Sequence, residues 1–166
     1  PTIYWGDDQT HSGRYTIGHA MATGSNVLIN SAYLHRAVTT PALSLDISLL
    51  DPGRSQRAGE TGSLLANDTG SEFMNIWQVD VADGDLSLDT FAVRYDETAG
   101  PNGAATVGDV EGFYYWDGTS GTWVDLTGDS TVDTANFLVN YDGSLVIPNG
   151  ASGFFALAAG GGVSPF

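Results

Sequence analysis

Four aspartates within ten residues form the densest group of carboxylates in this 166-residue sequence. Asp80, Asp83, Asp85 and Asp89 lie in and beside the turn segment Ala82-Asp83-Gly84-Asp85. Calcium takes roughly six to eight oxygen ligands, chiefly carboxylates and backbone carbonyls, so this group predicts a possible cofactor, Ca²⁺. Aspartate side chains also cap turns, and this interpretation is favoured over a metal site. A second acidic group, open to the same two interpretations, comprises Asp125, Asp129 and Asp133.

Aromatic residues suggest a second kind of site, on a hairpin formed by residues 112–116 and 122–126. If residues 117–121 form the loop, Tyr115 lies opposite Trp123, and Phe113, Tyr115 and Trp123 face outward together. Such a strip could stack on sugar rings or pack against another subunit. Burial against a second sheet is the favoured alternative. A loop shorter by one residue would reverse which residues pair.

Residues suited to covalent or acid–base catalysis are scarce. The chain has no lysine and no cysteine, and its three histidines are His11, His19 and His35. His11 could ligate a metal with Asp7 and Asp8, but no second histidine follows at a metal-binding spacing, and surface positions are the favoured interpretation. No nucleophile elbow of the G-x-S-x-G type is present. The paired carboxylates of a glycoside hydrolase could still be hidden among the acids, because their separation in space is not visible in a sequence. We therefore expect a protein that is not an enzyme, with no catalytic residues.

The charge balance restricts the partners of this chain. Twenty acidic residues against five arginines give a formal net charge of −15. Nucleic-acid phosphates require a basic surface, so nucleic acid is excluded as a partner. Anionic membrane surfaces are disfavoured for the same reason. The longest strongly apolar run, residues 154–159, is much shorter than the ~20 residues of a membrane-spanning helix.

Short strands separated by Gly and Asp turns predict an all-β fold. Residues 41–50 alternate apolar and polar side chains, and residues 26–38 read as strands rather than a helix because of their β-branched content. Hairpins are expected at Asp83-Gly84, at Asp117-Gly118 and at Tyr141-Asp142-Gly143. The prediction is an antiparallel β-sandwich of jelly-roll or immunoglobulin-like type, with residues 1–166 forming one domain with extended N- and C-terminal segments. The remaining predicted strands are 73–81, 86–95, 112–116, 122–126, 135–140, 144–147 and 153–159.

Two segments of the second half carry a resemblance. GFYYWDGTSGTWVDLTG, residues 112–128, and SGFFALAAG, residues 152–160, look like parts of the β-sandwich modules of large secreted or surface proteins of bacteria. The resemblance covers about residues 72–160. It implies an extracellular or cell-surface location and a non-catalytic role, and it transfers no functional residue to this chain.

These observations lead to one expected function and two alternatives. We expect an extracellular structural protein that assembles with copies of itself, as a subunit of a surface layer or filament. The apolar, β-prone residues Ile3, Tyr4 and Trp5 are the expected assembly segment, because an extended terminus can complete a neighbour's sheet. The first alternative is a carbohydrate-binding module with glycans as partners, and the second is a glycoside-active hydrolase. A chain that begins at Pro1 is also expected to be processed or to be a segment of a longer protein.

Overall fold

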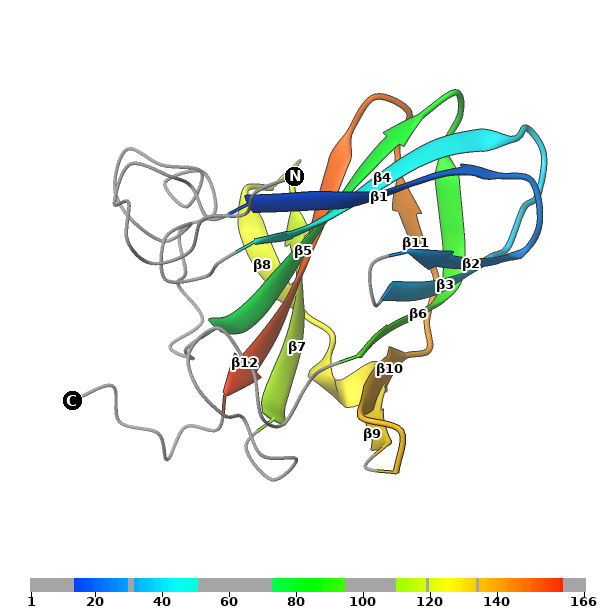
Figure 1. Ribbon diagram of the computed structural model, residues 1–166. Coiled ribbons are helices and arrows are strands. Elements are labelled where there is room, and N and C mark those ends of the chain that lie inside the picture. The colour runs from blue at the N-terminus through cyan, green and yellow to red at the C-terminus, as the bar shows by residue number, and fades with distance from the viewer. Residues whose placement is uncertain are drawn as a thin grey trace.

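Two antiparallel sheets pack against each other in this protein, which confirms the predicted all-β sandwich (Figure 1). The computed structural model describes residues 14–29, 32–50, 73–94, 110–118, 120–133 and 135–159. The first sheet has the strand order β1-β4-β5-β12-β7-β8. Its strands are β1 (Arg14–Ala22), β4 (Leu43–Leu50), β5 (Phe73–Ala82), β7 (Val110–Asp117), β8 (Thr122–Asp125) and β12 (Ser152–Ala159).

The second sheet has the order β2-β3-β6-β10-β9, and β11 also pairs with β6. The chain passes from the first sheet to the second at three places, between β1 and β2, between β5 and β6, and between β8 and β9. The described residues contain no α-helix, and no helix among them is long and apolar enough to cross a membrane. The strands of the second sheet are β2 (Asn26–Ile29), β3 (Ala32–Arg36), β6 (Leu86–Arg94), β9 (Ser130–Asp133), β10 (Leu138–Tyr141) and β11 (Leu145–Ile147), and η3 (Thr127–Asp129) is a short 3-10 turn.

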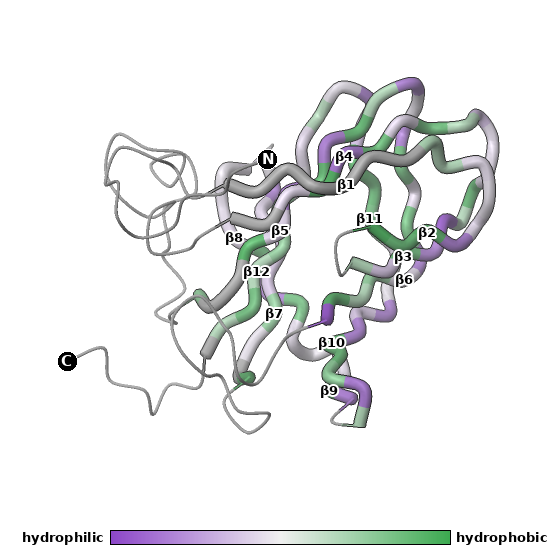
Figure 2. The backbone as a smooth tube through the Cα atoms, viewed as in Figure 1, coloured by the Kyte–Doolittle hydropathy of each residue, from purple (hydrophilic) through white to green (hydrophobic). Residues whose placement is uncertain are grey.

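The main core lies between the sheets, where the apolar face of each strand meets the other sheet. Hydrophobic segments follow β5, β12 and β7 through the middle of the molecule (Figure 2). Phe91 from β6 and Phe155 from β12 stack across the interface with ring centroids 3.9 Å apart, and Phe113 stacks on Phe155 at 5.9 Å. Each such aromatic pair adds about 0.5–1.5 kcal/mol beyond the burial of its surface. These contacts hold the two sheets in one fixed arrangement.

A second apolar cluster lies on the opposite face of the first sheet. We call Phe73, Tyr114, Trp116, Trp123 and Phe154 the outer aromatic cluster. Phe154 lies opposite Trp116, and Trp116 lies opposite Trp123, so one row crosses three neighbouring strands. The Trp123 ring meets Phe73 edge-on at 4.7 Å and Trp116 at 5.4 Å. This cluster thickens the molecule on the side away from the second sheet.

One buried arginine, at the end of β3, joins the β1–β2 connection to the β3–β4 connection. Arg36 is 1% exposed, and its guanidinium donates to the carbonyl oxygens of Ala22 at 2.6 Å and Pro41 at 2.7 Å. A longer bond of 3.4 Å reaches the Gly24 carbonyl. Burial lowers the pKa of Arg36 below its ordinary value, yet an arginine stays protonated in a protein. The charge is therefore stabilised by backbone carbonyls, and its role is structural.

The predicted strands are largely confirmed, with two topological corrections. Residues 26–38 form β2 and β3, as expected from their β-branched content. The predicted hairpin at Asp83-Gly84 is wrong, because β5 and β6 belong to different sheets and do not pair, and the turn carries the chain from the first sheet to the second. Asp83 takes a φ of 70° and Gly84 a φ of 150°, which suits a tight turn. The predicted hairpin at Tyr141-Asp142-Gly143 is wrong, because β10 and β11 both run antiparallel to β6 along its same side. These residues interrupt a strand instead of reversing the chain.

Candidate functional site

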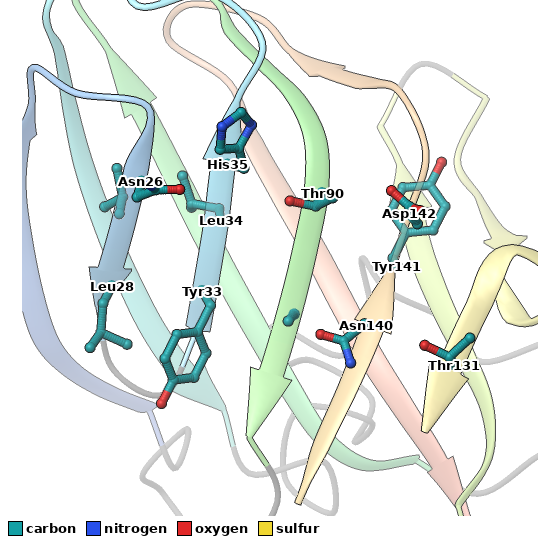
Figure 3. A pocket seen from close by; sticks show the side chains of 12 residues that line it. Asn26, Leu28, Tyr33, Leu34, His35, Thr90, Thr131, Asn140, Tyr141 and Asp142 are labelled. Atoms are coloured by element: carbon teal, nitrogen blue, oxygen red, sulfur yellow. The ribbon is translucent and has the colours of Figure 1, made fainter. Parts of the chain in front are cut away.

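The outward face of the second sheet carries a continuous row of side chains, one from each of five strands. Leu28 lies opposite Tyr33, Tyr33 opposite Ala92, Ala92 opposite Asn140, and Asn140 opposite Thr131. The sequence neighbours of these residues on β3, β6 and β10 are buried in the core, so the row points away from the first sheet. Figure 3 shows this row across the sheet.

A second row runs parallel to the first, nearer the other end of the strands. Asn26 lies opposite His35, and His35 lies opposite Thr90. Asp142, just after β10, stands beyond Thr90 on the same side of the sheet (Figure 3). Together the two rows line a shallow open depression of about 640 Å³, which we call the groove. A hollow of this size accepts a small or extended ligand.

A histidine–aspartate pair fixes one side chain of the groove. His35 Nδ1 lies 2.5 Å from Asp89 Oδ1, and both side chains are close to half exposed. A carboxylate only accepts, so in this pair Nδ1 carries the proton and donates it. In the neutral ring the other nitrogen, Nε2, is then an acceptor. The pair therefore holds His35 in one tautomer on the wall of the groove.

The other groove residues are mostly neutral and suited to hydrogen bonding. Asn26 and Asn140 each offer donors and an acceptor, and Thr90 and Thr131 add hydroxyl groups. Tyr33, partly buried on β3 and second in the row, adds an aromatic ring. Asp142 is the only acidic residue among the described residues that line the groove, and they include no arginine. The site can bind a polar ligand with an apolar face, and it lacks a cluster of charges.

The predicted outward strip of Phe113, Tyr115 and Trp123 is wrong as a common surface. The loop is one residue shorter than expected, so Asp117 pairs with Thr122 and Trp116 with Trp123. This one-residue change reverses the faces. Phe113 is 1% exposed in the main core, and half-buried Tyr115 packs against Phe155 on that same side. Trp123 is 8% exposed in the outer aromatic cluster, on the other face.

The four aspartates predicted to bind calcium are distributed over different parts of the sandwich. Asp80 lies on the outer face of the first sheet, where Gln78 and Ser152 donate to its carboxylate. Asp89 lies on the outer face of the second sheet, next to His35. Asp83 and Asp85 lie in the turn between β5 and β6. Among the described residues, no three acidic or histidine side chains come together as metal ligands. Calcium binding therefore stays a prediction, and the described residues do not bring its four aspartates together as ligands of one ion.

Several aspartates cap turns, as the favoured interpretation predicted. The Asp133 carboxylate accepts from the backbone N–H of Ala135 and from both nitrogens of Asn136. The side-chain bond from Asn136 is the main cause that holds the pKa of Asp133 below its usual value. Asp125 accepts from the Thr127 backbone N–H in the same way, at 2.9 Å. These carboxylates stabilise the connections of β8, β9 and β10.

The sequence does not single out the groove residues, and His35 stands out in it only as one of three histidines. The alternation in Ala32–Arg36 places Tyr33 and His35 on one face of a strand, and that signal was available. Their neighbours Asn140 and Thr131 lie about a hundred residues away, and only the strand order brings them together. The predicted assembly segment, Ile3, Tyr4 and Trp5, lies outside the described residues.

Comparisons of the chain with protein-family models, with curated proteins and with solved structures find no match.

Proposed function

We propose that this chain is a non-catalytic extracellular module that binds a saccharide in the groove. The main support for this proposal is the row of side chains that crosses an open face of the second sheet, Leu28, Tyr33, Ala92, Asn140 and Thr131. A sugar ring has an apolar face and a rim of hydroxyl groups. Tyr33 suits the apolar face, and the amide and hydroxyl side chains suit the rim.

The charge of the protein supports a neutral ligand over the charged alternatives. The chain carries a net charge of −15, and the described lining of the groove contains no arginine. Phosphates, sulfates and uronic acids would meet electrostatic repulsion without a compensating cation. A neutral saccharide meets no such barrier.

A purely binding role is supported by the shortage of catalytic groups in the groove. Glycoside hydrolysis requires two carboxylates flanking the scissile bond. Among the described lining residues only Asp142 is acidic, and Asp89 is already paired with His35. The extracellular part of the proposal rests on the resemblance of residues 112–128 and 152–160 to secreted modules.

The test is retention on neutral polysaccharides, by affinity electrophoresis through gels containing xylan, mixed-linkage β-glucan or galactomannan. Tyr33→Ala should weaken the binding by about tenfold or more, because truncating an aromatic contact with the ligand costs more than about 1.4 kcal/mol. Val146→Ala is the matched control, since Val146 is exposed on the same sheet and lies outside the groove lining. Equal retention of Tyr33→Ala and the wild type, at equal melting temperature, would contradict the proposal.

Self-assembly is the second candidate function, and the open sheet edges favour it. Val124 on β8 and Val132 on β9 are 42% and 41% exposed on edge strands of the two sheets. Exposed apolar edges invite pairing with another chain. Sedimentation of Val132→Lys against the loop control Val38→Lys tests this role. If the protein assembles through β9, only the first variant dissociates the assembly.

A further inference from the structure

The ligand of the groove can be narrowed from the spacing and the ends of its main row, and this step rests on the proposed saccharide function. The row takes one side chain from each of five adjacent strands. Neighbouring strands lie about 4.8 Å apart, so the four spacings make a row about 19 Å long. The rise per ring of an extended β-linked sugar chain is close to one strand spacing. One ring per strand therefore fits the row.

Both described ends of the row lie on edge strands. Leu28 on β2 is 63% exposed at one end, and Thr131 on β9 is exposed at the other. No described side chain closes either end in the manner of a pocket for a terminal sugar. A longer chain can continue past β2 and past β9, so interior rings can occupy the row.

The two halves of the row differ in chemistry. Leu28 and Tyr33 offer apolar surface on the half from β2 to β6, where Ala92 is only 8% exposed, whereas Asn140 and Thr131 offer hydrogen bonds on the half from β10 to β9. Ala92 is the smallest side chain of the row and lies between Tyr33 and Asn140 (Figure 3 labels both). A ring stacked on Tyr33 is thus followed by rings held through their hydroxyl groups. Tyr33 carries the one aromatic ring of this row among the described residues, so we expect the affinity to depend on several sugar rings.

We infer that the groove binds an interior stretch of a neutral, unbranched, β-linked polysaccharide that crosses the strands of the second sheet, with about one ring for each strand. A helical or branched chain would leave the straight row after one or two rings. An anionic chain would be repelled by the net charge of −15. The specificity is therefore for chain shape and neutrality, with contacts spread along the row.

The test is calorimetric titration of the intact chain with cello- and xylo-oligosaccharides of increasing length. Affinity should rise from two rings to about five, by about tenfold or more in total, and then stop rising, because five strands at about 4.8 Å set the length of the row. Thr131→Val should lower the affinity for five rings by about threefold to tenfold, the usual value of one hydrogen bond, and leave the affinity for two rings unchanged. Thr131 is exposed on an edge strand, so this substitution spares the fold.

The outcomes separate the two proposals. If no oligosaccharide or polysaccharide binds, the proposed saccharide function fails, and this inference fails with it. If one sugar ring binds as tightly as five, or if oligogalacturonate binds more tightly than the neutral chains, saccharide binding stands and the inference is overturned. If Thr131→Val weakens two-ring and five-ring ligands equally, the placement of rings along the row is wrong.

Discussion

Replacing Trp123 with alanine tests whether the outer aromatic cluster is a structural layer. Trp123 is buried except for 8% of its surface, and its ring contacts Phe73 and Trp116. A buried tryptophan covers roughly 150–250 Å², which at about 25 cal/mol per Å² corresponds to about 4–6 kcal/mol. Trp123 lies on the edge strand β8, where neighbours can relax into the vacated space. We therefore expect a loss of about 3–5 kcal/mol in the free energy of unfolding.

Urea unfolding and thermal melting measure this loss, and the melting temperature should fall by roughly 6–20 °C for a chain of this size. Trp123→Phe is the matched variant. It keeps most of the ring and removes an indole N–H that has no hydrogen-bond partner among the residues the structure describes, so its cost should stay below about 1.5 kcal/mol. Retention on polysaccharide should be unchanged in both variants that remain folded. If Trp123→Ala is as stable as the wild type, the structural role of Trp123 is refuted. If this variant loses retention on polysaccharide at unchanged stability, Trp123 contacts the ligand instead.

Three further predictions follow from buried or clustered charges. Arg36→Met should lower the free energy of unfolding by about 2–4 kcal/mol, measured in urea, because it leaves the carbonyls of Ala22 and Pro41 without their donor. The second prediction concerns two tyrosines. Burial raises the pKa of Tyr115, and the negative charge of Asp117 raises it further. Burial and the charge of Asp129 raise the pKa of Tyr141 in the same way. As the pH rises, the two phenols therefore ionise in the unfolded chain before they ionise in the folded one. Their contribution to the free energy of unfolding is constant below about pH 10 and falls at higher pH. The double variant Tyr115→Phe/Tyr141→Phe should therefore lose less stability between pH 8 and 11 than the wild type. The third prediction concerns calcium binding at the Asp83-Gly84-Asp85 turn. If calcium binds there, excess chelator lowers the melting temperature, and Asp85→Asn weakens this effect. A melting curve that chelator leaves unchanged would show that calcium does not bind at this turn.

The fold was predictable wherever the signal is local. The alternation in residues 43–50 depends on a few adjacent residues and appears in the structure as β4. The Asp83-Gly84 signal correctly marks a turn, but this turn crosses from one sheet to the other instead of closing a hairpin. The sequence analysis did not predict β1 or β9. β9 gives little signal, because Ser130–Asp133 is short and has no apolar alternation. The Tyr141-Asp142-Gly143 signal was misread because turn residues also suit an interruption between two strands that share one partner. Distinguishing the two requires the position of β6.

The candidate site depended on information that is not local. Tyr33 and His35 share a face by simple alternation, but their importance comes from Asn140 and Thr131, which the strand order places beside them. The predicted strip failed at a single point, the length of the loop after Asp117. Because side chains alternate along a strand, that one residue moved Phe113 into the core. A sequence pattern thus predicts which residues of one strand share a face more reliably than it predicts which residues of other strands lie beside them.

The acidic composition and the proposed site belong to separate parts of the molecule. Described aspartates such as Asp133 and Asp125 accept from backbone N–H groups in turns, and Asp85 accepts from the Asn149 N–H between the β5–β6 turn and the β11–β12 turn. These carboxylates hold the connections and give the surface its negative charge. The groove uses mainly amides, hydroxyls and one tyrosine ring, which a charge count does not reveal. The acids therefore determine which ligands are repelled, and the few neutral groups of the groove determine which ligand is held.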